Sequence, residues 1–243
     1  MPVTVEQLCA RYHVDVAHAG HVAAMSLDLF DRLPHVHRLP PERRRLLETA
    51  AILHNIAYAS DPKRHDVVGR DRILAETLSG FTRHERDMIA CTTRFHRKQA
   101  RPDEEPVFRA LPAALQKETL ALAALLRVGD AFDYSQAQTC RIVSHEEIGD
   151  AVRVVVEGPH ADEEAARANR KADLWNEVFP HPLTVLTAIE AAAEAKSAAA
   201  ESAVPRPKSP AVRADDPIAV TGCKVLQLYF SQLRDAKAPA SRA

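Results

Sequence analysis

The chain is poor in aromatic residues and in glycine: aromatics make up 5% of its 243 residues, and it has only seven glycines. This scarcity argues against a β-sandwich, whose strands and turns draw on aromatic, β-branched and glycine residues. The four cysteines form no CxxC pair, so neither a disulfide framework nor a zinc knuckle is indicated. The formal net charge of −1 favours neither a nucleic-acid site nor a membrane surface as the partner.

Two further absences concern the location of the protein. The first residues, MPVTVEQLCARYHVD, do not have the basic-then-apolar pattern of a signal peptide, and no apolar run approaches the length of a membrane span. We therefore expect a cytoplasmic protein. Its hydrophobic and charged fractions, 46% and 27%, are ordinary for a folded chain. The abundance of Ala, Leu and Arg favours a mostly helical fold.

The hydrophobic pattern of residues 1–136 predicts a series of helices. The first begins at Thr4, where TVEQ has the spacing of a capping box. The further helices are expected over about 14–33, 40–59, 66–78, 83–96 and 115–136. The helix over 40–59 changes from a charged start to an apolar end, so it is expected to run from the surface into the core.

After these helices the sequence becomes rich in β-branched residues. CRIVS and AVRVVVEG predict a β-hairpin, with HEEIGD between them as the turn. A charged helix is expected over 162–179, and HPLTVLT is a candidate third strand. The fold class is therefore mainly α, a helical bundle with a small appended β-hairpin or three-stranded sheet.

The C-terminal part has a different composition. Residues 188–214 read as an Ala/Pro-rich linker whose Ala-rich beginning extends as a helix. Residues 215–236 predict one amphipathic helix, with Asp216 as its cap and Pro217 at its first position.

Histidines and carboxylates in apolar, helical surroundings are the candidate site. Asp130 interrupts the apolar run LLRVGDAFD, and burying an unpaired carboxylate costs several kcal/mol, so it needs a cation, an arginine such as Arg127, or several donors. Asp133 either shares the face of Asp130 or reaches solvent. The histidines where burial and acidity coincide are His18, His54, His65 and His96. Of His18 and His21, one turn apart, either is a candidate surface residue.

Four segments occur in the order found in HD-domain phosphohydrolases: HAGHVAAMSLDLFD, LLETAAILHNIAYA, TTRFHRK and LALAALLRVGDAFDYSQ. The chain resembles in particular the helical C-terminal domain of the Ppx/GppA (exopolyphosphatase/guanosine pentaphosphate phosphatase) family, over about residues 5–187. RANRKADLWNEVF resembles the segment after the hairpin in that domain. The resemblance implies an HD-type bundle over 1–187. The actin-like ATPase-fold half of those phosphatases, with its glycine-rich phosphate loop, has no counterpart in this sequence.

By this resemblance the metal ligands fall on His18, His54, Asn55 and Asp130. Asn55 stands where the family motif has Asp; a carboxylate bridges two cations and offsets their charge, whereas a carboxamide offers one neutral oxygen. The resemblance therefore implies one weakly held divalent cation (Mn, Mg or Fe) on His18, His54 and Asp130. Of the histidine-rich run that related domains carry next, only His65 remains, which disfavours a second metal.

His96, Arg97 and Lys98 are the candidate phosphate-binding residues, because His96 falls at a position typical of the Ppx-like domain and its neighbours are cations. The alternative is a solvated basic helix end. Residues 215–236 resemble the start of a CHAD domain, a helical module associated with polyphosphate; either the CHAD domain is truncated here, or the helix binds a partner.

Two hypotheses of function follow. The first is a weakened or inactive module that binds phosphorylated ligands (polyphosphate or a nucleotide) or mediates assembly, with a homodimer as the implied assembly. The second is an active mononuclear metal-dependent phosphohydrolase acting on the same ligands. Asn55 favours the first hypothesis.

Overall fold

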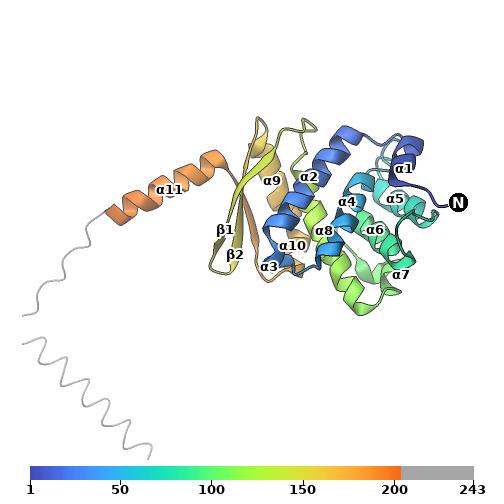
Figure 1. Cartoon of the computed structure of the whole chain (residues 1–243). Helices are drawn as coiled ribbons and strands as arrows, with labels where there is room; N and C mark the ends of the chain where they lie inside the picture. Colours follow the sequence, from blue (N-terminus) through green and yellow to red (C-terminus); the bar gives the residue numbers. More distant parts are fainter. Residues whose placement is uncertain (204–243) are drawn as a thin grey trace, which may run out of the picture. The chain divides into compact units, whose positions relative to one another are not determined.

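The structure, a computed structural model, describes residues 1–203 (Figure 1). The predicted helix over 215–236 and the end of the predicted linker lie outside these residues. Within them, Met1–Lys196 form one compact unit, to which the following description applies. The described residues form eleven α-helices, two short 3-10 helices and one three-stranded sheet, which confirms the mainly α fold with a small appended sheet. No helix in residues 1–203 is both long and apolar enough to span a membrane.

Eight α-helices precede the sheet. They are α1 (Val5–Tyr12), α2 (Val16–Arg32), α3 (Pro34–His37), α4 (Arg44–Leu53), α5 (His65–Leu74), α6 (Arg83–Phe95), α7 (Pro106–Arg109) and α8 (Ala113–Ala131). The 3-10 helices are η1 (Pro41–Arg43) and η2 (Pro102–Glu104). Helix α8 packs against α2, α4 and α6, and Figure 1 shows these helices grouped around it. Many buried apolar side chains of α2, α4, α6 and α8 belong to one hydrophobic cluster, so α8 is the central helix of the core.

The start of α1 agrees with its sequence signal. The Thr4 hydroxyl accepts a hydrogen bond from the Gln7 backbone N–H at 3.2 Å, and the Gln7 side chain accepts one from the Thr4 N–H at 2.9 Å. This reciprocal pair is the predicted capping box, which satisfies two otherwise free donors at the helix start.

Helix α4 ends at Leu53, not at residue 59 as predicted. Residues from His54 to Ser60 form successive turns, closed by bonds such as Tyr58 N to Asn55 O at 2.9 Å. The His54 side chain explains the difference, because its Nδ1 bonds to the Ala51 carbonyl at 2.6 Å. That carbonyl would accept the Asn55 N–H in a continuing helix, so the side chain competes with the backbone.

The sheet has the order β1-β2-β3. Strands β1 (Arg141–Ile148) and β2 (Ala151–Glu157) pair antiparallel, and β3 (Leu183–Thr187) pairs parallel to β2. The turn between β1 and β2 is Gly149–Asp150, with Gly149 at φ +60°. The predicted turn HEEIGD was therefore too long, since residues 145–148 belong to β1. These polar residues are tolerated in the strand because most of β1 is exposed to solvent.

The predicted charged helix is divided in two at Ala172, into α9 (Ala161–Lys171) and α10 (Asp173–Val178). Helix α9 packs on α8 and on strands β2 and β3. It therefore joins the sheet to the helical core. Strand β3 leads directly into α11 (Ala188–Ala203), so the Ala-rich beginning of the predicted linker is helical.

Side chains occupy the outer edge of β3. The Val185 N–H donates to Asn169 Oδ1 and the Val185 carbonyl accepts from Asn169 Nδ2, both at 2.8 Å. The Leu183 N–H donates to Asn176 Oδ1 at 3.0 Å, and the Thr187 N–H donates to Glu190 Oε2 at 2.8 Å. This edge is thus satisfied within the chain.

A close approach of α2 and α8 places the candidate site. A Cβ atom on Gly129 would lie 2.1 Å from Ser26 Oγ, which Cβ atoms essentially never do, and 3.0 Å from the Ser26 backbone nitrogen, which is an unusually tight contact. Glycine in a helix interior costs about 1 kcal/mol relative to alanine, and here it allows the two backbones to meet. The next residue, Asp130, is thereby held close to His18 on α2.

Candidate metal centre

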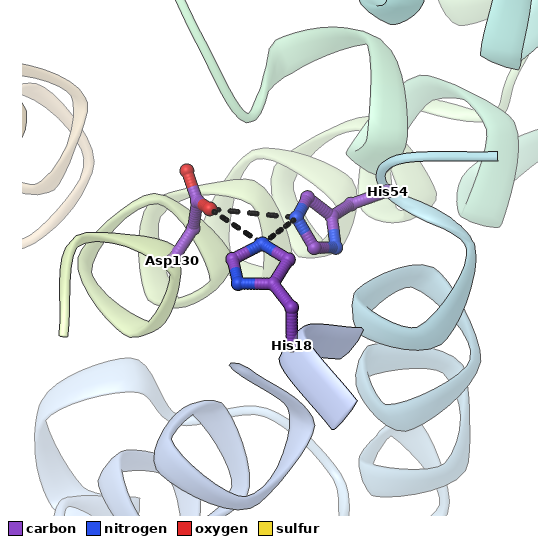
Figure 2. Close-up of side chains that lie close together, drawn as sticks. All are labelled: His18, His54 and Asp130. Carbon is purple, nitrogen blue, oxygen red and sulfur yellow. Dashed lines mark hydrogen bonds and ion pairs between the residues drawn. The ribbon is translucent and has the colours of Figure 1, made fainter. Parts of the chain in front are cut away.

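His18, His54 and Asp130 converge, although they come from three separate elements (Figure 2). His18 lies in the first turn of α2, His54 follows the end of α4, and Asp130 lies in the last turn of α8. The two Nε2 atoms are 3.2 Å apart. Asp130 Oδ1 lies 3.4 Å from His54 Nε2 and 3.8 Å from His18 Nε2.

The outer nitrogens of both rings are committed to acceptors. His18 Nδ1 lies 2.7 Å from Asp133 Oδ2, and His54 Nδ1 lies 2.6 Å from the Ala51 carbonyl oxygen. A carboxylate and a carbonyl only accept, so each Nδ1 carries the hydrogen and each neutral ring turns a bare lone pair at Nε2 toward the other. Together with Asp130 Oδ1, the two Nε2 atoms place three hydrogen-bond acceptors next to one another, and none of them carries a hydrogen to donate. Such a cluster requires a shared proton or a metal cation.

Asp133 is buried and holds His18 instead of reaching solvent. It also accepts hydrogen bonds from the Gln138 backbone N–H at 2.8 Å and from Gln138 Nε2 at 3.0 Å. A carboxylate on the far nitrogen of a histidine is the usual support for a histidine that binds a metal, because it fixes the tautomer and raises the basicity of the ring.

The partner of Asp130 is Lys171, at the end of α9, and not Arg127. Lys171 Nζ forms an ion pair with Asp130 Oδ2, whereas Arg127 bonds to Asp173 and to the Phe95 carbonyl. Burial would raise the pKa of Asp130, but the Lys171 ammonium and then His54 outweigh it and hold this pKa well below its usual value. Burial lowers the pKa of Lys171, and Asp130 offsets part of that change.

Asn55 lines the same cavity as His18 and Asp130. Its Oδ1 atom is buried and has no hydrogen-bond partner among the described residues. An unpartnered carboxamide oxygen beside two imidazoles and a carboxylate fits one divalent cation with mixed nitrogen and oxygen ligands. Metal binding by His18, His54, Asn55 and Asp130 remains a prediction.

His65 and His96 form a second pair, with Nε2 atoms 3.2 Å apart. His96 Nδ1 donates to the Thr93 carbonyl at 2.5 Å. His65 Nδ1 has two neighbours at 2.8 Å, the Pro62 carbonyl oxygen and Arg97 Nη1. An arginine nitrogen never accepts, and Arg97 Nη1 also lies 3.1 Å from the same carbonyl.

The tautomers of this second pair follow from Arg97. If Arg97 donates to both the Pro62 carbonyl and His65 Nδ1, then His65 carries its hydrogen on Nε2 and donates it to His96. Under this assignment every member is satisfied, and Arg97, His65 and His96 form a hydrogen-bonded chain that needs no cation. Burial lowers the pKa of His65, and burial together with His54 lowers the pKa of His96 well below its usual value. Both changes favour neutral rings.

The predicted phosphate-binding residues occupy three different positions. His96 is buried, 2% exposed, and its nitrogens are used in the chain just described. Arg97, like His96, lines the cavity over the candidate metal centre, whereas Lys98 does not and instead donates to the Lys63 carbonyl at 3.1 Å. Two cations that line this cavity, Arg167 and Lys171, were not predicted. They lie on the charged helix α9, whose sequence does not distinguish them from solvated residues.

The cavity has a volume of about 230 Å³ and a mostly polar lining. Its lining residues are His18, Asn55, Tyr58, His65, His96, Arg97, Asp130, Asp133, Tyr134, Gln136, Arg167 and Lys171. The larger cavity between α1, α2 and α4, about 790 Å³, is lined by none of His18, Asn55 and Asp130. The candidate centre therefore opens into the small polar cavity.

Fold and site together define a class: a helical domain whose central helix supplies one carboxylate to a pair of inward-facing histidines. The model of one family, Ppx/GppA phosphatase, domain III, matches residues 2–167. The chain belongs to this family. The matched range contains His18, His54 and Asp130 and ends before Lys171.

Proposed function

We propose that this domain binds a phosphorylated ligand, polyphosphate or a nucleotide, in the cavity over the metal centre, with at most one divalent cation and little or no hydrolysis. The observation that carries the proposal is the ion pair between Lys171 and Asp130. Asp130 directs Oδ1 toward the two histidines and Oδ2 toward the ammonium. One carboxylate oxygen is left for a cation, and Asn55 adds no charge that would attract a second one.

The charges of the cavity lining support binding of an anion. Three cations, Arg97, Arg167 and Lys171, face two carboxylates, Asp130 and Asp133, so with neutral histidines the lining carries a net charge of +1. Arginine and lysine side chains are the usual partners of phosphate oxygens, arginine because its planar fork matches two oxygens at once. The lining therefore attracts phosphate before any metal is bound.

A divalent cation at this centre would polarise a phosphoryl oxygen as a Lewis acid. The chain's own contribution is orientation. Asp133 fixes His18, the Ala51 carbonyl fixes His54, and Lys171 holds Asp130. The cations Arg97 and Arg167 would hold the phosphate group of the ligand against this centre.

The second candidate function is a mononuclear metal-dependent phosphohydrolase. It is favoured by the three convergent acceptor atoms and by the carboxylate that supports His18, since a well-held metal is what such catalysis needs. Membership of the Ppx/GppA phosphatase domain III family agrees with either candidate.

The test combines metal analysis, binding and turnover on the full chain. The purified protein is analysed for metal, titrated calorimetrically with pyrophosphate and with adenosine 5′-monophosphate, and assayed for phosphate release with Mn²⁺ or Mg²⁺. We expect binding without turnover, weakened about tenfold or more by Arg167→Gln, which removes a charge-assisted contact. Arg170→Gln is the matched control, because Arg170 is an exposed arginine on the same helix outside the cavity lining.

Two results would decide against this proposal. Turnover that His54→Ala abolishes would establish the hydrolase instead. Equal binding by the Arg167 and Arg170 variants would remove the cavity as the phosphate site. The implied homodimer is a separate prediction, to be checked by light scattering of the purified chain.

A further inference from the structure

Two tyrosines are exposed at the cavity over the metal centre. Tyr58 is 46% exposed and Tyr134 is 53% exposed, and both line this cavity. Among residues 1–203 they are the only exposed Phe, Tyr or Trp side chains, in a chain with 5% aromatics. A single exposed apolar side chain is common on a protein surface and needs no explanation. Two exposed aromatic rings at the same polar cavity are unusual and suggest a role in binding.

The position of each ring is set by the site. Tyr58 lies four residues after His54, in the turns that follow α4, and Tyr134 lies four residues after Asp130, just beyond α8. The Tyr58 ring meets the edge of the His65 ring, with centroids 5.2 Å apart and planes at 67°. The Arg167 guanidinium lies 5.0 Å from the centroid of the Tyr134 ring. Contacts that orient both rings in advance reduce the entropy cost of binding a ligand.

These rings distinguish between the two ligand classes of the proposed function. Inorganic polyphosphate has no apolar face, so an aromatic ring adds nothing to its binding. The cations alone are enough to bind it. A nucleotide carries a planar base, and stacking on an aromatic side chain stabilises any base without requiring a particular sequence. The rings therefore suit a ligand that joins a phosphate to a flat ring.

Space next to the cavity agrees with a ligand larger than phosphate. An adjoining cavity of about 210 Å³ shares four lining residues with the first: His18, Asn55, Tyr58 and Gln136. Small-molecule sites have volumes of roughly 300–1,000 Å³, which neither cavity reaches alone. Tyr58, common to both, lies where a ligand would pass from one to the other.

We propose that Tyr58 and Tyr134 are specificity-determining residues that stack on the base of a nucleoside phosphate, while Arg167 and the neighbouring cations hold its phosphate. This inference rests on the proposed phosphate-binding function and selects the nucleotide from its two ligand classes.

The test is calorimetric titration of the full chain with adenosine 5′-monophosphate, guanosine 5′-monophosphate, ribose 5-phosphate and pyrophosphate. At least one nucleotide binds about 5- to 150-fold more tightly than ribose 5-phosphate, the range that corresponds to stacking on one aromatic side chain. Tyr134→Ala and Tyr58→Ala each reduce this ratio, because each lowers the affinity for the nucleotide more than the affinity for ribose 5-phosphate. Tyr134→Phe keeps the ratio because it keeps the ring. Val143→Ala, an exposed apolar residue on β1, is the surface control.

Three other results would contradict this inference. If ribose 5-phosphate or pyrophosphate binds as tightly as the nucleotides, the tyrosines do not select and the inference fails, while the phosphate-binding function stands. If no probe binds, both fail. If the nucleotide preference persists in both alanine variants, or is lost in Tyr134→Phe, stacking on these rings is overturned.

Discussion

Two histidine pairs in this domain have the same distance between their facing Nε2 atoms, but only one of them has a hydrogen available for that contact. In both, the Nε2 atoms are 3.2 Å apart. In the His18–His54 pair both outer nitrogens face acceptors, so the inner lone pairs have no hydrogen between them. In the His65–His96 pair Arg97 supplies a donor to the outer nitrogen of His65, which frees a hydrogen for the inner contact.

The difference shows that the partner of Nδ1 decides whether Nε2 of the same ring is a donor or an acceptor. With Asp133 and the Ala51 carbonyl behind it, the first pair is predicted to need a cation, whereas the contact with Arg97 lets the second pair form its own hydrogen bond. Distance between the rings alone would have given two identical sites. The following predictions test this contrast, beginning with the largest expected effect.

Removing one ring from each pair gives the sharpest separation. We expect His54→Ala to reduce affinity for Mn²⁺ at least about a hundredfold, because one of three convergent ligands is lost. His65→Ala is the matched variant, and its affinity is expected to stay within about threefold of the original. Calorimetry and metal analysis after dialysis measure both, with thermal unfolding as the check that each variant folds. Comparable losses in the two variants would mean that both pairs hold cations.

Removing the support behind His18 is expected to have the next largest effect. Asp133→Asn keeps the size of the side chain but weakens the contact that fixes the His18 tautomer, so Mn²⁺ affinity should fall about 10- to 100-fold. Asp173→Asn is the control, since Asp173 forms an ion pair with Arg127 and not with His18, His54 or Asp130. An unchanged affinity in Asp133→Asn would show that this carboxylate only packs the core.

Asn55→Asp adds the carboxylate that the resemblance to HD-domain phosphohydrolases implies at this position. We expect Mn²⁺ affinity to rise about tenfold, corresponding to about 1.4 kcal/mol, with one equivalent still bound. In a metal chelator the same variant should be less stable to urea, because a buried charge replaces a neutral amide. If this variant bound a second equivalent of metal, the His65–His96 pair would be a metal site as well, and the proposed difference between the two pairs would be wrong.

The smallest expected effect is a pH dependence of stability from the second pair. Burial lowers the folded-state pKa of His65 and His96 below the unfolded value. The unfolded chain therefore binds more protons, and the free energy of unfolding in chelator should fall as the pH drops below about 6.5. The slope is up to about 1.4 kcal/mol per pH unit for each such histidine. Urea unfolding at pH 7.5, 6.5 and 5.5 measures this slope, and His65→Gln should make it shallower. If the variant and the original chain have the same slope, His65 does not cause the pH dependence.

Much of the fold could be predicted from local patterns. The order of the helices, the hairpin and the third strand followed from hydrophobic periodicity, capping residues and β-branched runs. The end of α4 could not, because residues 54–59 are compatible with a helix and only the contact of His54 with the Ala51 carbonyl stops it. The extent of β1 was underestimated because its polar residues resemble a turn.

The candidate site was predicted partly from an apolar context and partly from the resemblance. Asp130 interrupts an apolar run, whereas His18 and His54 were assigned by the resemblance to HD-domain phosphohydrolases, and the structure brings the three together. Lys171 and Arg167 were not predicted, since they lie among other charges on α9 and acquire a role only when that helix packs on α8. The role of Asp133 was left open because a residue beyond a helix end can turn inward or outward.

The side chains along β3 have a consequence for assembly. Asn169, Asn176 and Glu190 already accept from the N–H groups of Val185, Leu183 and Thr187 on the outer edge of that strand. A further strand therefore finds no free backbone donor at these three positions, which protects β3 against edge-to-edge pairing with another chain.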